Sequence, residues 1–145
     1  MSIKSKLNVS SKQAMLIKVK TGIDIVCIKD VQDLADVPTE VWITEQEWKD
    51  VLAVSNETHQ LQRLAGKFAC KEAVLKVLGS GIDEIELVDI EVLHDISGKP
   101  IVSLQKSALS SWHKIAAIDL DVSISHEGAW AIAIAVATCQ QDYFL

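Results

Sequence analysis

The chain is organised around the segment Lys67-Phe68-Ala69-Cys70-Lys71-Glu72-Ala73-Val74-Leu75-Lys76-Val77-Leu78-Gly79, which we interpret as the second half of a long helix that begins near His59. Glu72 falls inside the apolar stripe of this helix, which contains Leu61, Leu64, Ala65, Phe68 and Leu75. Because an ionised carboxylate is costly to bury without a partner, this position predicts a cation, a metal ion or the edge of a cleft beside Glu72. An ordinary ion pair with Lys76, one turn later, is the simpler alternative on this helix alone.

Length and charge limit the class of protein. The chain has 145 residues, 49% of them hydrophobic, so we expect one domain with its own core. Its 20 acidic and 14 basic side chains give a formal net charge of -6. This balance argues against a protein that binds the nucleic-acid backbone, although it is compatible with a local basic pocket.

Cysteine usage and hydropathy predict the compartment. The three cysteines, Cys27, Cys70 and Cys139, are odd in number and far apart, so they fit neither a disulfide framework nor a zinc site. The longest apolar stretch, residues 129–139, is too short to cross a bilayer, and the first residues contain no apolar signal segment. We therefore expect a cytoplasmic protein with no membrane span.

The polar residues 1–15 predict a flexible N-terminal tail, which leaves residues 16–145 as the domain. From Leu16 apolar residues alternate with polar ones, and this alternation predicts a half-buried strand. Asp24 falls on the polar face of that strand, close to its end. The apolar face consists of Ile17, Val19, Thr21, Ile23 and Ile25.

Helices are predicted next. A short helix over residues 28–35 follows the strand, and the capping box Thr44-Glu45-Gln46-Glu47 predicts another over residues 45–53. The long helix is expected to start after Asn56 or Thr58, both good N-caps, and to close at a glycine.

The second half of the chain is mostly strand. Residues 86–93 and 100–104 predict a hairpin, residues 107–117 a helix with Leu109 buried, and residues 119–125 and 130–137 two final strands. The last strand has an alanine face, which lets a helix of the same chain or a neighbouring subunit approach closely. The pattern predicts an α+β domain, with a mainly antiparallel sheet and one long helix packed on it.

Several local features can converge in such a fold. They are Asp24 at the end of the first strand, Glu72 with Lys76 on the long helix, the loop Gly79-Ser80-Gly81, and His126 at a hairpin tip. Two carboxylates from distant positions are what a hard divalent ion such as Mg²⁺ uses, with water and substrate phosphates completing its shell. Lys67, Lys71 and Lys76 would then supply positive charge for a phosphorylated ligand. Taken singly, each feature also has an ordinary explanation as a solvated lysine, a helix cap or a packing histidine.

Short motifs along the chain occur together in one order. They are Gly22-Ile23-Asp24-Ile25-Val26, Phe68-Ala69-Cys70-Lys71-Glu72-Ala73 followed by Lys76 and Gly79-Ser80-Gly81-Ile82, then Gly98-Lys99-Pro100, and Ser123-Ile124-Ser125-His126. In this order they resemble holo-acyl-carrier-protein synthase, the small single-domain class of 4'-phosphopantetheinyl transferases. The resemblance extends from about Leu16 to Ala137.

The resemblance implies a transferase that moves the phosphopantetheine arm of coenzyme A to a serine of an apo acyl carrier protein, of the fatty-acid or polyketide type, and releases adenosine 3',5'-bisphosphate. It implies that Asp24 and Glu72 hold Mg²⁺ and that Lys76 and His126 bind the phosphates of coenzyme A. Catalysis would then come from positioning and from charge neutralisation. Glu72 and a water molecule on the metal are both candidates for the group that removes the serine proton.

The resemblance also suggests how the nucleotide is held. The loops Gly79 to Gly81 and Gly98 to Pro100 look like those that hold the nucleotide end of coenzyme A, and Lys67 stands where the family usually has an arginine. A lysine there keeps the positive charge but cannot donate the two parallel hydrogen bonds that a guanidinium gives to a phosphate. Members of the class are trimers with sites between subunits, which the alanine face of the last strand would permit.

The chain departs from the family in the segment after Asp24. Where the family usually has a glutamate and, three residues later, an arginine that receives the acidic carrier, this chain has Cys27 and Asp30. Asp30 would repel an acidic carrier helix, although Lys29 could partly substitute. A noncatalytic relative that binds coenzyme A or a carrier as a regulatory or assembly module is therefore an alternative, as is a Glu72–Lys76 pair that binds nothing. The intact metal and phosphate residues favour the enzyme.

Overall fold

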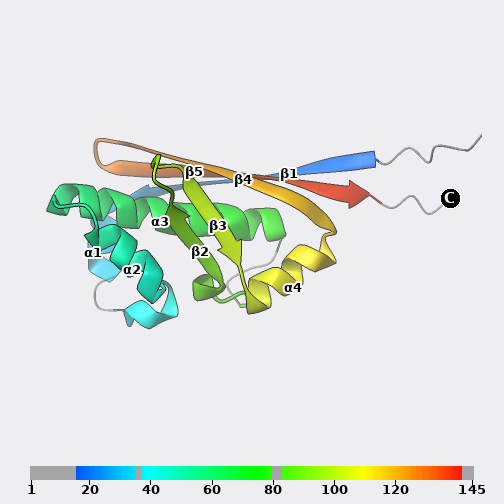
Figure 1. Cartoon of the computed structure of the whole chain (residues 1–145), viewed down its shortest axis with the longest axis horizontal. Coiled ribbons are helices and arrows are strands. Elements are labelled where there is room, and N and C mark those ends of the chain that lie inside the picture. Colours follow the sequence, from blue (N-terminus) through cyan, green and yellow to red (C-terminus); the bar gives the residue numbers. More distant parts are fainter. Residues whose placement is uncertain (1–15, 35–36, 80–82, 142–145) are drawn as a thin grey trace, which may run out of the picture.

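The long helix α3 (Glu57–Leu78) lies under a three-stranded antiparallel sheet in the computed structural model of the chain (Figure 1). The structure describes residues 16–34, 37–79 and 83–141, so the predicted tail and Gly81 lie outside the described residues. The sheet has the strand order β1-β5-β4, with β1 at Leu16–Cys27, β5 at Trp130–Gln141 and β4 at Ala117–Glu127.

The remaining elements pack around the other sides of α3 (Figure 1). They are α1 (Ile28–Asp33), η2 (Thr39–Val41), α2 (Glu45–Leu52), η3 (Leu87–Asp89), the antiparallel hairpin of β2 (Ile90–His94) and β3 (Pro100–Leu104), and α4 (Lys106–Lys114). The predicted α+β class, with a mainly antiparallel sheet and one long helix packed on it, is confirmed.

The ends of several elements differ from the predictions. The strand predicted from residue 86 begins with the 3-10 turn η3, because the Ser107 hydroxyl accepts a hydrogen bond from the Glu86 amide while Ser107 donates to the Asp89 carboxylate, and these bonds hold the chain in a turn. The helix predicted over residues 107–117 ends at Lys114, since Ala116 takes a left-handed φ of 51°. Leu109, expected to be buried on this helix, is 40% exposed.

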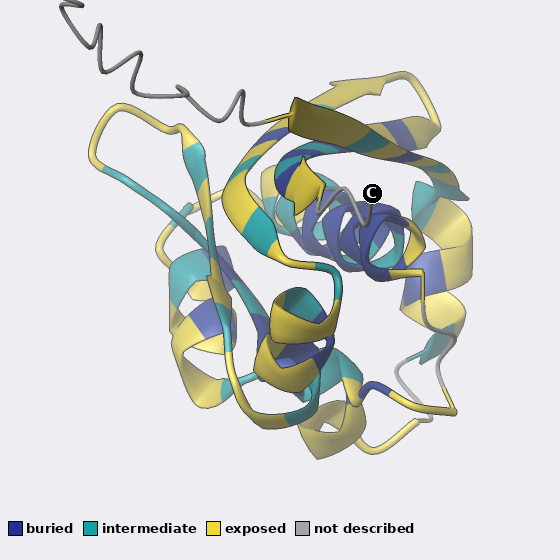
Figure 2. Cartoon of the chain, turned by 90° about the vertical axis from the view of Figure 1, so that its right-hand side faces the viewer, coloured by how far each residue is buried: buried dark blue, intermediate teal, exposed yellow. Residues whose placement is uncertain are grey.

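Both ends of α3 are capped as the sequence predicts. The side chain of Asn56 accepts a hydrogen bond from the His59 amide, and Gly79 ends the helix with a φ of 71° while its amide donates to the Leu75 carbonyl. The helix is buried along most of its circumference, as the dark blue central helix of Figure 2 shows. It therefore acts as the core around which both sheets pack.

Small residues bring the large sheet close to α3. A Cβ at Gly22 would lie 2.0 Å from the carbonyl oxygen of Ala73, and one at Gly66 would lie 2.8 Å from Ile124. The alanine face of β5, which is fully covered, consists of Ala131, Ala133, Ala135 and Ala137. Of the two neighbours predicted for that alanine face, the helix of the same chain is the one found.

The buried face of β1 is the reverse of the predicted one. Gly22 is buried and Asp24 half-buried toward α3, whereas the apolar side chains point away from the helix. The strand turns its small residue to the helix because no larger side chain fits against the Ala73 backbone. The resulting outer sheet face is 38–59% exposed and consists of Ile17, Val19, Ile23, Ile25, Ile132 and Ile134.

Among the described helices, none is long and apolar enough to cross a membrane.

Candidate functional site

Asp24, Glu72 and Lys76 meet on one flank of α3. β1 carries Asp24 past the helix, and Glu72 and Lys76 lie one turn apart on α3. The Lys76 ammonium donates to Asp24 Oδ1 at 3.0 Å and to the Ile23 carbonyl at 2.6 Å. The side chain of Lys76 is 52% exposed and that of Asp24 is 20% exposed, so this group lies at the protein surface.

The two carboxylates are close enough to influence each other. Burial raises the pKa of Glu72 above its usual range, the negative charge of Asp24 raises it further, and Lys76 opposes both effects. Lys76 pairs with Asp24, and in the described part of the chain it forms no ion pair with Glu72. The simple Glu72–Lys76 pair is therefore not the arrangement found, and a cation shared by both carboxylates would relieve their repulsion.

The donor set at this position suits a magnesium ion. Two carboxylates lie together, and among the described residues no group of three or more histidine, cysteine, aspartate or glutamate side chains gathers around a metal-sized site. Mg²⁺ usually binds to one or two carboxylates and takes its other oxygens from water and substrate phosphates. Structural zinc and calcium sites need more protein ligands than Asp24 and Glu72 provide.

An apolar pocket opens beside Asp24. It lies between β1, α1 and α3, and its lining includes Val31, Leu34, Phe68 and Trp130 in addition to Asp24. Asp30 of α1 lies at the same pocket and is exposed. A chain segment or an extended ligand arm bound in this pocket would thus reach both the carboxylate pair and α1.

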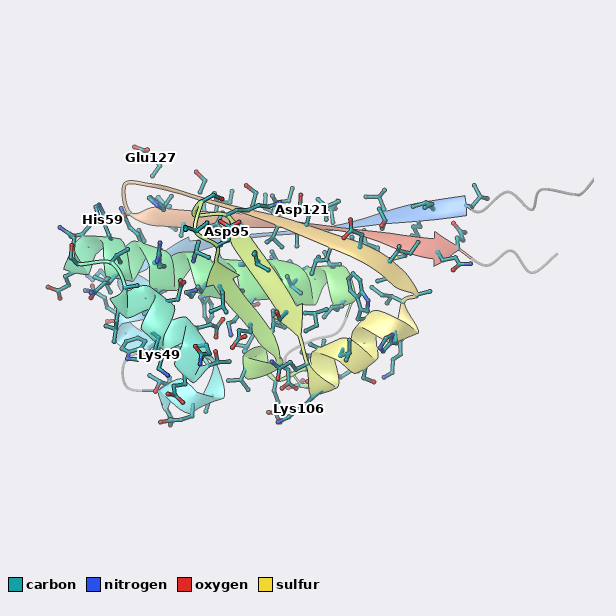
Figure 3. The ribbon with its side chains drawn as sticks, viewed as in Figure 1. Lys49, His59, Asp95, Lys106, Asp121 and Glu127 are labelled. Carbon is teal, nitrogen blue, oxygen red and sulfur yellow. The ribbon has the colours of Figure 1, made fainter. Side chains whose placement is uncertain are left out.

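His126, Gly98 and Pro100 come together in a second place, the α3–β4 cleft. This cleft has a volume of about 390 Å³ and is also lined by His59 and Arg63 of α3. The hairpin tip, which carries Asp95, and the β4–β5 turn, which carries Glu127, lie toward the same end of the molecule as His59 (Figure 3).

Within a single chain, therefore, His126 does not lie beside Asp24 and Glu72, and the prediction that these features converge at one place is wrong there. Asp24 on β1 lies opposite Ala133, which lies opposite Ile124 on β4, so the cleft and the carboxylate pair are separated by the width of the sheet and flank α3 on different sides. Gly79 is exposed at the C-terminal end of α3, and Gly81 lies outside the described residues.

Lys67 and Lys71 are not available as surface cations. Both side chains are 0% exposed, and they pair with acidic residues of α2, Lys67 with Asp50 at 2.5 Å and Lys71 with Glu47 at 2.8 Å. Burial lowers the pKa of each lysine, and its acidic partner opposes that shift. The expectation that these ammonium groups face a phosphorylated ligand does not fit this geometry, because each is already neutralised inside the protein.

Sequence reasoning missed Asp50, Arg63 and His94. His94 Nδ1 lies 2.8 Å from Asp50 Oδ2, and Arg63 donates to the Asp50 backbone carbonyl at 2.9 Å. One feature of the sequence could have drawn attention to Arg63. It lies one turn before Lys67, so two cations occupy neighbouring turns of the same helix.

The comparisons with known proteins identify the family of the chain. Residues 20–135 match the family model of the 4'-phosphopantetheinyl transferase superfamily. The chain is 37% identical over 117 residues to a holo-[acyl-carrier-protein] synthase of Halalkalibacterium halodurans, which covers 78% of this chain and 89% of the relative. It is 45% identical over 75 residues to one of Alkaliphilus metalliredigens, a match that spans 52% of this chain and 62% of the relative.

A solved structure shares the fold. The holo-(acyl-carrier-protein) synthase of Bacillus anthracis, in complex with CoA (3',5'-ADP), superposes with a TM-score of 0.68 at 33% identity, over 87% of this chain and 99% of that one. The family match, over residues 20–135, includes the segments that carry Asp24, Glu72 and His126. The chain therefore belongs to the 4'-phosphopantetheinyl transferase superfamily.

Proposed function

We propose that this chain transfers the 4'-phosphopantetheine group of coenzyme A to a serine of an apo acyl carrier protein and releases adenosine 3',5'-bisphosphate. The observation that carries this proposal is the meeting of Asp24 and Glu72, with Lys76 beside them, in a chain whose relatives are holo-acyl-carrier-protein synthases. The related Bacillus anthracis structure with bound CoA supports coenzyme A as the donor.

Asp24 and Glu72 are the proposed holders of Mg²⁺. When bound, the ion would neutralise charge on the diphosphate from which the phosphopantetheine leaves. Lys76 is exposed and ends in a flexible ammonium, so it can exchange its contact with Asp24 for a phosphate oxygen of the substrate. Glu72 and a water molecule are the two candidates that receive the serine proton.

A homotrimer is the proposed assembly. The outer sheet face presents neighbouring isoleucines across β1 and β5, with Ile23 opposite Ile134 and Ile25 opposite Ile132. Exposed apolar patches of this kind mark contact surfaces between proteins. Within a single chain the α3–β4 cleft lies apart from the carboxylate pair. A complete site would therefore combine the cleft of one subunit with Asp24 and Glu72 of its neighbour.

The location proposed for the enzyme is the cytoplasm. The free thiols of Cys27, Cys70 and Cys139 support a reducing compartment.

Transfer is tested by incubating the protein with coenzyme A, Mg²⁺ and a panel of apo carrier proteins, and by measuring the intact mass of each carrier. We expect at least one carrier to gain one phosphopantetheine group in the presence of Mg²⁺ and none to gain it in excess EDTA. Binding of coenzyme A without transfer to any carrier would instead support the noncatalytic alternative.

Asp30 on α1 is the proposed determinant of carrier choice. It lies at the pocket beside Asp24, where a carrier must approach to present its serine. Asp30→Arg should raise kcat/KM for an acidic carrier on the order of tenfold at low salt, because a cation at this surface speeds association with an acidic partner. The gain should shrink as ionic strength rises.

Asp33→Arg, the same charge reversal near the end of α1, is the matched control for Asp30→Arg and should give a smaller gain. A lower rate for Asp30→Arg with every acidic carrier would contradict the role assigned to α1.

A further inference from the structure

The pocket beside Asp24 has an acidic rim. Its charged lining residues are Asp24 and Asp30, and no basic side chain of the described residues contributes to it. Asp24 accepts a hydrogen bond from Lys76 at 3.0 Å and is a proposed ligand of Mg²⁺. Asp30 is exposed, and in the described part of the chain it takes part in no ion pair. A partner that enters this pocket therefore meets the charge of Asp30 without a counter-charge.

The orientation of α1 decides which of its charges faces the pocket. Asp30, Val31 and Leu34 line the pocket. Lys29 and Asp33 do not line it, and because they are one turn apart they share another side of α1, where their opposite charges offset each other. The expectation that Lys29 substitutes for an arginine at this surface does not fit this geometry. The charge that α1 presents to the pocket is negative.

Apolar side chains lie next to Asp30. Val31 is buried, Leu34 and Phe68 are half-buried, and Trp130 is 51% exposed. They line a pocket of about 390 Å³, a size within the range of ligand pockets. A carboxylate beside apolar surface attracts a cation more strongly than a carboxylate in open water, because the effective dielectric constant is lower. A partner that fits this surface combines apolar contact with a positive charge.

We propose that the native acceptor is a carrier protein that places a lysine or arginine against Asp30, and not a carrier whose docking surface is acidic throughout. This inference rests on the proposed function. The pocket is lined by both α1 and Asp24, so a carrier that brings its serine to the carboxylate pair passes Asp30. An acidic side chain facing Asp30 would be repelled, whereas a basic one would form an ion pair at the edge of the apolar surface.

The charge of the whole chain acts in the same direction. Its net charge of -6 slows the approach of an acidic carrier at long range. Asp30 adds a local repulsion at the place of contact. The two effects together favour a carrier with a basic group near its acceptor serine.

The test uses an acidic apo acyl carrier protein as the probe, with a set of single variants of it. In each variant one acidic residue of the helix next to the acceptor serine is replaced by lysine. With the unaltered enzyme, at least one lysine carrier should have a kcat/KM about tenfold higher than that of the parent carrier at low salt, as measured by intact mass over time. This advantage should shrink as ionic strength rises.

Asp30→Arg should reverse the order, so that the parent carrier is modified faster than the best lysine carrier. The four combinations of enzyme and carrier form a double-mutant cycle, which isolates the pair of charges from other effects of each substitution. Asp33→Arg, a charge reversal on another side of α1, is the matched control and should keep most of the preference for the lysine carrier. An unaltered enzyme that prefers the parent carrier to every lysine carrier would overturn the inference, as would an undiminished preference in Asp30→Arg.

Binding gives a readout that does not need transfer. Carriers with alanine in place of the acceptor serine cannot be modified, so titration calorimetry measures their Kd directly. The lysine carrier should bind the unaltered protein about tenfold more tightly than the parent carrier does at low salt, and Asp30→Arg should lose this difference. If no carrier were modified while the binding difference held, the proposed function would be contradicted and the pairing at Asp30 would stand. Transfer to carriers regardless of the charge facing Asp30 would support the proposed function and refute the pairing.

Discussion

Replacing Glu72 by glutamine is expected to reduce phosphopantetheine transfer at least about 100-fold, the scale found when one electrostatic contact to the reacting groups is removed. The side chain keeps its size, but it loses the charge that, with Asp24, is proposed to hold Mg²⁺. The initial transfer rate to an apo carrier at saturating coenzyme A, over a range of Mg²⁺ concentrations, measures the effect. The half-saturating Mg²⁺ concentration should rise as well.

The pH dependence of magnesium binding gives a second signature of Glu72. Burial and the charge of Asp24 hold the pKa of Glu72 above its usual range, so protons compete with Mg²⁺ for this carboxylate. In the unaltered enzyme the half-saturating Mg²⁺ concentration should therefore rise as the pH falls toward that raised pKa. In Glu72→Gln this part of the dependence should disappear, because glutamine does not titrate.

Glu57→Gln is the control for Glu72→Gln, since Glu57 lies exposed in the first turn of the same helix and away from the carboxylate pair. It should transfer at the normal rate. Thermal unfolding of Glu72→Gln should resemble that of the unaltered protein. A normal transfer rate in Glu72→Gln would reject its role as a metal ligand.

Local patterns in the sequence were sufficient to predict most elements. The capping box of Thr44 and Glu47, the Asn56 cap and the Gly79 terminus depend on neighbouring residues only, and each is found in the structure. The α+β class followed from the mixture of helical and alternating segments. The orientation of β1 was predicted wrongly, because alternation shows that a strand has two faces but not which face meets the helix.

That choice depended on a contact between distant segments. Gly22 meets the backbone of Ala73, and this contact puts the small residue inside and the isoleucines outside. The same orientation of β1 also places Asp24 beside Glu72. The position of Glu72 within an apolar stripe predicted a partner for its carboxylate, and the structure brings Asp24 near enough to act on its pKa.

The exposure of the lysines on α3 was not predictable from the sequence. The sequence placed Lys67, Lys71 and Lys76 on one helix, but only Lys76 lies beside the carboxylate pair. Whether a lysine is exposed depends on what packs over it. The helix α2 packs over Lys67 and Lys71 and pairs each of them with one of its acidic side chains. The capping residue Glu47 gave no local sign that it would also face Lys71.

Replacing Lys71 by methionine is expected to destabilise the protein by about 3–5 kcal/mol, the usual cost of removing one member of a buried ion pair. Glu47 is 0% exposed and depends on three donors, the amides of Thr44 and Val92 and the Lys71 ammonium. Methionine fills the space without donating, which leaves the Glu47 charge buried. Urea unfolding followed by circular dichroism measures the change in the free energy of unfolding.

The double variant Glu47→Gln with Lys71→Met separates charge from packing. Glutamine removes the uncompensated charge, so the double variant should be more stable than Lys71→Met alone. Lys49→Met, which breaks the exposed pair with Glu45 on the same helix, should change stability little. If Lys71→Met were as stable as the unaltered protein, Lys71 would not be neutralising Glu47, and an accessible role for its ammonium group would have to be reconsidered.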